Sequence, residues 1–452
     1  MINNSIDAYN KGYVWDYSQL EYFANISKLG DVNPYTGGES IKFQGLKSDA
    51  FGNENIDWQD EIERTNAGTH QYNVAVRGGS NSTIYSVSFH GSNKEGIYKN
   101  DNLNTYGGRL SLETDLTKGI KIGTNASYSE SKRNFSLSDE FYWYTQPFVV
   151  RPDLPIKNSA GDYNKIDEIG MMGGNGLYSP NPVAMLNMKN SHESSQLLAN
   201  AYAEFSIYKG LKFRADYGHT NYKYESSYFR PIITQQDQSI LGESPISTLT
   251  LWNGIYKTST ANFQVDYKLD TGKHNINALL GYGTERTRNV LTTLTYEGFP
   301  NDEVLNNVAS AKWSSGQNQI LQKHGLNSWF TRLNYGYFNK YFAEFSFRAD
   351  ASSKFGPNNQ WGYFPAFSAA WVASQENFFK HFRWLDNLKF RASIGQTGST
   401  NIDDFSYRQY YSSKGQYIGN SSIVLNDMLP NKGIKWEKTT ESNFGIDFAF
   451  LN

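Results

Sequence analysis

Polar and apolar residues alternate along most of this chain with a period of two. Successive side chains of a strand point to opposite faces of a sheet, so each alternating segment predicts a β-strand with one apolar and one polar face. The apolar members of the clearest segments are Ala201, Ala203, Phe205 and Ile207; Leu211, Phe213, Ala215 and Tyr217; Ala261, Phe263, Val265 and Tyr267; Tyr341, Ala343, Phe345, Phe347 and Ala349; Leu388, Phe390, Ala392 and Ile394; and Phe444, Ile446, Phe448 and Phe450.

Weaker alternation adds further strands to this set. It falls at 70–78, 83–91, 103–115, 119–130, 273–290, 327–338 and 364–374. The pattern therefore predicts an all-β chain of about 13 antiparallel strands. Several are near the roughly 9–11 residues with which a tilted strand crosses a bilayer.

The connections between these strands alternate between short and long. Short ones contain Gly, Asn or Asp, which supply the backbone conformations of tight turns, and lie at 117–119, 208–210, 269–272 and 338–340. Long ones are expected at 131–195, 227–255, 292–325 and 399–437. Short turns at one end and long loops at the other are typical of an outer-membrane β-barrel.

The polar face carries charges that a dry core does not accept. Lys212, Arg214 and Asp216 share one face of one segment, and burying unpaired ions is costly. A water-filled lumen on that side and lipid on the other resolve the conflict. We therefore expect one continuous, strongly curved sheet in sequence order. Its concave face should carry Arg214, Gln264 and Glu344, and its outward face Phe213, Phe263 and Phe345.

Aromatic residues gather near the predicted strand ends. Examples are Tyr335 and Tyr337 beside Tyr341, and Trp361 beside Tyr363. Membrane barrels place such girdles where lipid meets water. Cross-strand aromatic packing in any large sheet is the alternative interpretation.

Composition narrows the classes of protein that fit this pattern. The 452 residues include 42 basic and 44 acidic side chains, a net charge of −2 that argues against a basic nucleic-acid-binding face. The absence of cysteine excludes disulfides, thiolate metal sites and cysteine catalysis. The N-terminus shows no basic start followed by an apolar stretch, so we expect no signal peptide in this chain. A mean hydropathy of −0.62 does not conflict with a barrel, because barrel strands alternate.

One block of sequence resembles a known family signature. It runs Ser-Ser-Lys-Phe-Gly-Pro-Asn-Asn-Gln-Trp-Gly-Tyr-Phe-Pro over 352–365 and continues to Ser368-Ala-Ala-Trp371. This block is similar to the signature of SusC/RagA-type TonB-dependent transporters, the outer-membrane nutrient importers of Bacteroidota. Shorter matches occur in order along the chain, at 57–61, 71–74, 78–80, 95–97, 181–184, 388–395 and 436–441.

The resemblance implies a plugged barrel of 22 strands, energised through TonB–ExbB–ExbD and paired with a SusD-like surface lipoprotein. By this comparison the chain is a partial transmembrane barrel, with about 13 of the expected 22 strands and no plug domain. Residues 1–69 are expected to be an extracellular-loop region before the first recognisable strand, and 70–452 the partial barrel. An isolated product of this length is expected to leave two sheet edges unpaired and to aggregate.

Few residues of the sequence suggest a catalytic, metal-binding or ligand-binding site. The seven histidines form no metal-binding spacing, and no nucleophile or phosphate-loop motif is present, so we expect no enzyme, no cofactor and no metal. Asp350, Asp386 and Glu376 are interpreted as rim or turn residues. Tyr142, Trp143 and Tyr144 open the longest loop and could stack on a sugar or grip a peptide; an interfacial girdle is the alternative.

Two functions follow from these observations. The first is a segment of a TonB-dependent importer that binds an oligosaccharide or peptide and passes it across the outer membrane, surrounded by outer-membrane lipid. The alternative is a soluble all-β carbohydrate-binding or glycosidase-like module rich in aromatics.

Overall fold

The described residues cover most of the predicted strands. The computed structural model describes residues 27–29, 43–46, 53–135, 150, 152–164, 181–232, 246–300, 306–379, 385–409, 411–417, 420–425 and 430–450. Among them, no helix is long and apolar enough to cross a membrane.

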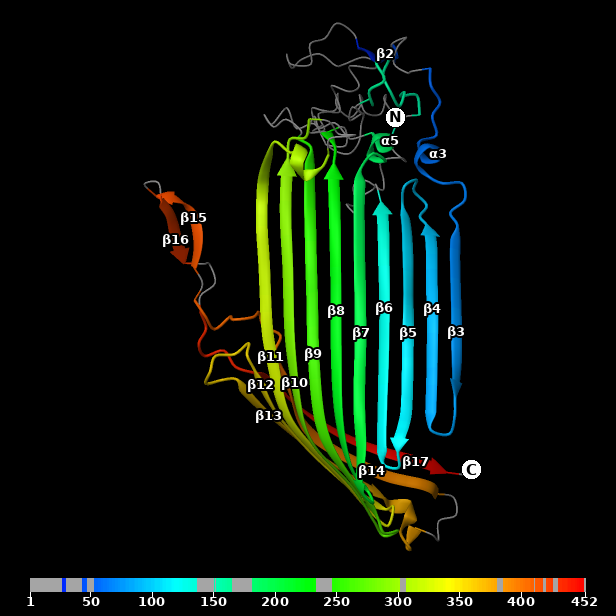
Figure 1. The fold of residues 1–452 in the computed structure, drawn as a ribbon, viewed down its shortest axis with the longest axis vertical. Coiled ribbons are helices and arrows are strands. Elements are labelled where there is room, and N and C mark those ends of the chain that lie inside the picture. Colours follow the sequence, from blue (N-terminus) through cyan, green and yellow to red (C-terminus); the bar gives the residue numbers. More distant parts are fainter. Residues whose placement is uncertain are drawn as a thin grey trace.

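A single sheet of 13 strands dominates the fold (Figure 1). Its order is β17-β14-β13-β12-β11-β10-β9-β8-β7-β6-β5-β4-β3, so that, apart from β15 and β16, chain neighbours are sheet neighbours, and each pair is antiparallel. The strands are β3 (Thr69–Gly79), β4 (Thr83–Glu95), β5 (Asn102–Thr117), β6 (Ile120–Phe135), β7 (Lys189–Tyr208), β8 (Leu211–Arg230), β9 (Thr248–Asp270), β10 (His274–Glu297), β11 (Trp313–Tyr337), β12 (Tyr341–Ser352), β13 (Trp361–Val372), β14 (Leu385–Ser399) and β17 (Glu437–Phe450). The predicted sequence-order sheet is confirmed, with β3 and β17 as its edges.

Smaller elements lie in the connections. They are β1 (Ser27–Leu29) with β2 (Phe43–Leu46), α3 (Trp58–Ile62), α5 (Pro182–Met185), the 3-10 turns η3 (Val308–Ser310) and η4 (Ala373–Gln375), and the hairpin β15 (Tyr411–Tyr417) with β16 (Asn420–Leu425). The β15–β16 hairpin projects away from the sheet (Figure 1).

Short and long connections lie at opposite ends of the strands, as predicted (Figure 1). Gly119, Gly210 and Gly272 hold three of the short turns, with φ of 96°, 82° and 79°. Side chains rarely adopt these values, which explains glycine there.

Six strands extend further into the predicted loops than the alternation indicated. β6 ends at Phe135, β8 at Arg230 and β10 at Glu297. β7 begins at Lys189, β9 at Thr248 and β11 at Trp313. The upper part of β11 reads Ser-Ser-Gly-Gln-Asn-Gln from 314, polar on both faces, so no alternation marks it. Backbone pairing with β10 along its whole length makes it a strand.

The two faces of the sheet differ as predicted. Register pairs Arg214 with Gln264 on one face and Phe213 with Val265 on the other. Phe263 and Phe345 are 45% and 44% exposed, and Leu280 is 57% exposed. In the described part of the chain, no second large sheet packs on this apolar face. A hollow on the polar face reaches from Asn200 of β7 to Arg348 of β12.

Candidate functional site

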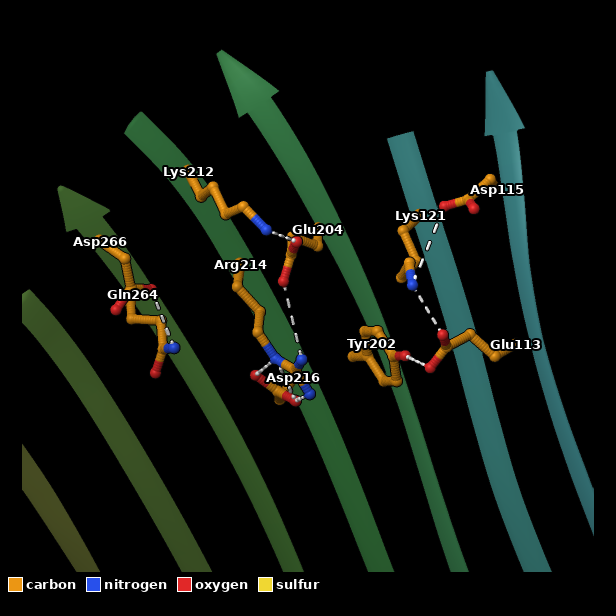
Figure 2. A network of polar contacts seen from close by, with 10 residues as sticks. All are labelled: Glu113, Asp115, Lys121, Tyr202, Glu204, Lys212, Arg214, Asp216, Gln264 and Asp266. Atoms are coloured by element: carbon orange, nitrogen blue, oxygen red, sulfur yellow. Dashed lines mark hydrogen bonds and ion pairs between the residues drawn. The ribbon is translucent and has the colours of Figure 1, made fainter. Parts of the chain in front are cut away.

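A network of polar side chains begins on the concave face of β5, β6 and β7 (Figure 2). Lys121 Nζ lies 2.7 Å from Glu113 Oε1 and 4.0 Å from Asp115 Oδ1. The second carboxylate oxygen of Glu113 accepts a hydrogen bond from the Tyr202 hydroxyl. Alternation puts all of these groups on one face of three adjacent strands, so the carboxylate bridges a cation and a phenol across them.

The network continues through Arg214 of β8. Its guanidinium makes a bidentate contact with Asp216, with Nε–Oδ2 and Nη2–Oδ1 distances of 3.0 and 2.8 Å. It also stacks over the Tyr202 ring at 3.9 Å and lies 3.9 Å from Glu204. Lys212 Nζ binds Glu204 at 2.6 Å. Planar stacking and a fork of donors suit arginine and not lysine at this position.

A hollow of about 580 Å³ opens beside Arg214, between β7 and β12. Its lining is largely polar and includes Asn200, Arg214, Asp216, Asn262, Gln264, Glu285, Ser328, Phe330 and Arg348. Gly281 and Gly283 carry no side chain into it, and a Cβ at Gly281 would lie 2.3 Å from the Phe330 ring. These glycines let an aromatic ring lie flat on the wall and keep the hollow open.

A second arginine pair forms the far side of the hollow. Arg348 Nε lies 2.9 and 2.8 Å from the two oxygens of Asp350, and Arg348 Nη2 donates to Ser328 at 2.8 Å. The Asp350 side chain is only 8% exposed. Arg348 and Asp350 are two residues apart on one strand, the same spacing as Arg214 and Asp216, so each acid is neutralised by its own strand.

The wall offers hydrogen-bond donors and acceptors and charges of both signs. Among the described residues, no group of three or more His, Asp or Glu could hold a metal ion. The carboxylates of this wall are mostly held by lysine, arginine or tyrosine. Such a surface can bind and release polar solutes.

The signature block organises the loop end of β12 and β13. Phe355 is fully buried, its ring lies 5.3 Å from that of Trp436, and Trp436 lies 5.2 Å from Phe364. Lys354 Nζ donates to the backbone oxygens of Thr400 and Ile402 at 3.4 and 2.9 Å. The Trp436 indole donates to Gln360 O at 2.7 Å. The block therefore fastens both ends of the β14–β17 connection to the barrel wall.

The residues singled out from the sequence fall in three places. Arg214 and Gln264 line the hollow, and Glu344 lies on the same face beside Arg332. Asp350 is not a rim residue, because it is buried against Arg348 on the concave face. Tyr142, Trp143 and Tyr144 lie outside the described residues.

Glu376 lies in the short connection after η4. It accepts hydrogen bonds from Tyr341 at 2.6 Å and Lys340 at 3.2 Å. These bonds lower the pKa of Glu376 below its ordinary value. The interpretation of Glu376 as a turn residue fits this position.

The bridge between Glu113, Lys121 and Tyr202 was not predicted from the sequence. Its partners lie on three strands, and only the strand register brings them together. A usable signal was present for the arginine pairs, since opposite charges at i and i+2 of a strand share a face.

Comparison with known proteins gives a consistent result. No protein-family model matches the chain. TonB-dependent receptor P3 of Formosa agariphila is 27% identical over 412 residues, covering 89% of this chain and 40% of that protein. TonB-dependent receptor SusC of Bacteroides thetaiotaomicron is 28% identical over 432 residues, covering 89% of this chain and 41% of that protein.

Solved structures agree on the fold. The RagAB peptide importer in its closed-closed state matches with a TM-score of 0.72 at 22% identity, over 89% of this chain and 44% of that chain. The open-open state gives 0.71. The chain thus spans about two fifths of the length of its curated relatives and adopts the fold of the corresponding barrel strands. With the signature block, the strand order and these relatives taken together, the chain is similar in sequence and in fold to a barrel segment of SusC/RagA-type TonB-dependent receptors.

Proposed function

We propose that this chain forms part of the wall of an outer-membrane nutrient importer that binds an oligosaccharide or peptide and passes it through the barrel. The observation that carries this proposal is the concave polar wall between β5 and β12, backed by an apolar outward face. A soluble carbohydrate-binding or glycosidase-like module would bury residues such as Phe263 and Leu280, which are 45% and 57% exposed.

The ligand class follows from the chemistry of the wall. Paired arginines and carboxylates present alternating donors and acceptors, which suit sugar hydroxyls as well as peptide groups. The name of the RagAB structures describes a peptide importer, which keeps a peptide among the candidates. We propose no catalysis, cofactor or metal, in keeping with relatives that are receptors and transporters.

The proposed partners follow from the relatives. We propose energisation by TonB–ExbB–ExbD, a SusD-like surface lipoprotein, a location in the cell outer membrane among its lipids, and no nucleic acid. We also propose that residues 1–69 belong to the extracellular side and 70–452 to the barrel. Arg64 supports the first assignment, because its Nη1 donates to Gly96 O and Tyr98 O in the β4–β5 connection, at the loop end.

Tyr142, Trp143 and Tyr144 are proposed to contact the ligand. They belong to the connection between β6 and β7 at the loop end of the wall, where incoming ligand would first meet the barrel. Flat aromatic rings bind sugar faces and peptide side chains without needing one fixed orientation.

Uptake by the protein at its full natural length tests the proposal. A strain lacking the gene would be complemented and fed labelled oligosaccharides or labelled peptides in separate experiments. Arg214→Gln with Arg348→Gln should reduce uptake of one class several-fold, whereas Val265→Leu on the lipid face should not. Uptake of neither class by the wild-type protein, despite correct insertion, would contradict the proposal. Alanine at 142–144 should lower ligand affinity in the same strain.

A further inference from the structure

Arg109 of β5 stands on the concave wall without an acidic partner. The residue is exposed, and in the described part of the chain no ion pair or hydrogen bond engages its guanidinium. Arg214 and Arg348, by contrast, each bind the acid two residues along their own strand. The residue at that spacing from Arg109 is Ser111, and the residue two positions before Arg109 is Gly107. The charge of Arg109 is therefore not neutralised by its own strand.

A hollow of about 420 Å³ opens beside Arg109 and adjoins the first hollow, since Asn200 and Thr260 line both. Hydroxyl and amide side chains make up most of its concave lining, which also includes Asn125, Ser127, Thr220 and Thr258. Among the described residues that line it, Arg109 is the one lysine or arginine, and none is a carboxylate. The register places Arg109 between Ser88 of β4 and Ser127 of β6. A solute in this hollow therefore meets one cation among neutral hydrogen-bonding groups.

The loop-side half of this wall lacks carboxylates. In the part of the chain that the structure describes, no concave position holds Asp or Glu over 86–94 of β4, 103–111 of β5, 125–133 of β6, 192–200 of β7, 218–226 of β8 and 252–260 of β9. The same positions hold Lys94, Arg109 and Arg133, and Arg133 contacts Asp101 outside these stretches. On the strand of Arg109 the nearest concave acid is Glu113, about 13 Å away along the strand. The carboxylate of Glu113 is already bound to a lysine and a tyrosine (Figure 2).

A guanidinium in such surroundings favours an anion of matching shape. Two parallel N–H donors of arginine fit the two oxygens of a carboxylate, and such a charge-assisted pair is stronger than a neutral hydrogen bond. We propose that Arg109 binds a carboxylate group of the transported solute, while the hydroxyl and amide side chains around it bind neighbouring polar groups. The inference rests on the proposed function and narrows it to cargo that carries negative charge. The carboxylate is either the terminal group of a peptide or a uronate of an oligosaccharide.

Titration of the protein at its full natural length, in neutral detergent micelles, tests this site. The probes are two acids, each with a neutral derivative: N-acetyl-trialanine with its C-terminal amide, and trigalacturonate with its methyl ester. One acid should bind at least about tenfold more tightly than its neutral derivative, and the acid that does so identifies the source of the carboxylate. Arg109→Gln should remove that preference. Arg109→Lys should retain part of it, because lysine keeps the charge and loses the fork of donors.

The matched control is Arg288→Gln, which removes the same charge from an exposed outward position of β10. It should change binding of either acid by less than about twofold. Heat-modifiable migration in gels checks that each variant folds. An equal loss of preference in Arg109→Gln and Arg288→Gln would overturn the site, because it would reflect net charge alone.

The remaining outcomes separate this site from the proposed function. Equal affinity for acid and neutral derivative, binding of neither acid, or a preference that persists in Arg109→Gln would overturn the carboxylate site. A lower unfolding temperature in Arg109→Gln with the preference unchanged would assign Arg109 to a carboxylate of its own chain and would also overturn it. Uptake restricted to neutral solutes would leave the importer standing without this site, whereas no uptake of any solute would contradict the proposed function itself.

Discussion

The wall from β7 to β11 and the wall formed by β12 and β13 begin alike at the short turns but end differently. The first has strands of 20, 20, 23, 24 and 25 residues, and the second has strands of 12 residues each. Both walls carry the same outward apolar band next to the short turns. Above that band the long strands continue, whereas the short ones give way to the packed loops of the signature block.

This difference separates two ways of holding a loop end rigid. In the long wall, backbone pairing between β10 and β11 continues to Glu297 and Trp313. In the short wall, side-chain packing holds the loop end instead, through the cluster of Phe355, Phe364 and Trp436. Backbone pairing depends little on side-chain identity, so the long wall tolerates polar residues on both faces. A small aromatic core accepts far fewer substitutions, because its side chains must fit one another. This accounts for the specific sequence of the signature block.

Trp436→Ala should have the largest effect. Removing a buried aromatic side chain costs about 3–5 kcal/mol, and here it also removes the hydrogen bond to Gln360. Urea unfolding in micelles and protease cleavage of the β14–β17 connection would measure it. Phe378→Ala is the control, since Phe378 is 59% exposed; an equal loss in both variants would mean that the signature core does not support the short wall.

The second-largest loss of stability is expected when a charge is placed on the outward apolar band. Leu280→Arg places a cation at a position proposed to face lipid, where the expected cost is about 2–4 kcal/mol near the bilayer midplane. Asn277→Arg, on the concave face of the same strand, should cost less than about 1 kcal/mol. Folding efficiency into lipid vesicles compares the two. If both variants fold equally well, the outward face of the long wall does not contact lipid.

Arg348→Met tests the pair on the short wall. It leaves the carboxylate of Asp350 without its bidentate partner, at a cost of about 1–3 kcal/mol. The additional substitution Asp350→Asn should recover part of that loss, because it removes the unpaired charge. A double-mutant cycle from urea unfolding gives the coupling energy; purely additive losses would show that the pair is not coupled.

The smallest effect is expected at Glu376. Its pKa is lowered by hydrogen bonds from Tyr341 and Lys340, so the folded state favours the ionised form. That stabilisation is present above the ordinary pKa of the carboxyl group and is lost as the pH falls through the lowered value. Glu376→Gln should therefore narrow the difference in unfolding midpoint between pH 7 and pH 3. If that difference is unchanged, Glu376 does not contribute to the loss of stability in acid.

The sheet and its two faces were predictable from the sequence, but the contacts between side chains of different strands were not. Strict alternation in segments such as 211–217 fixes which side chains share a face, so the lumenal position of Arg214 was predictable. The upper part of β11 was not predictable, because its residues are polar on both faces and only pairing with β10 makes it a strand. The bridge from Glu113 to Tyr202 depends on register across three strands, which no local pattern encodes. The role of Lys354 depends on where a distant connection packs.

The pairing of each arginine with the acid two residues along its own strand has a consequence for a moving solute. Arg214 with Asp216 and Arg348 with Asp350 are dipoles fixed on the wall, not separate charges. The potential of a dipole decays with distance faster than that of a single charge. A solute more than a few ångströms from these two pairs therefore experiences little net charge from them. In the proposed importer, these pairs would bind a solute that touches the wall and would not hold one that passes at a distance.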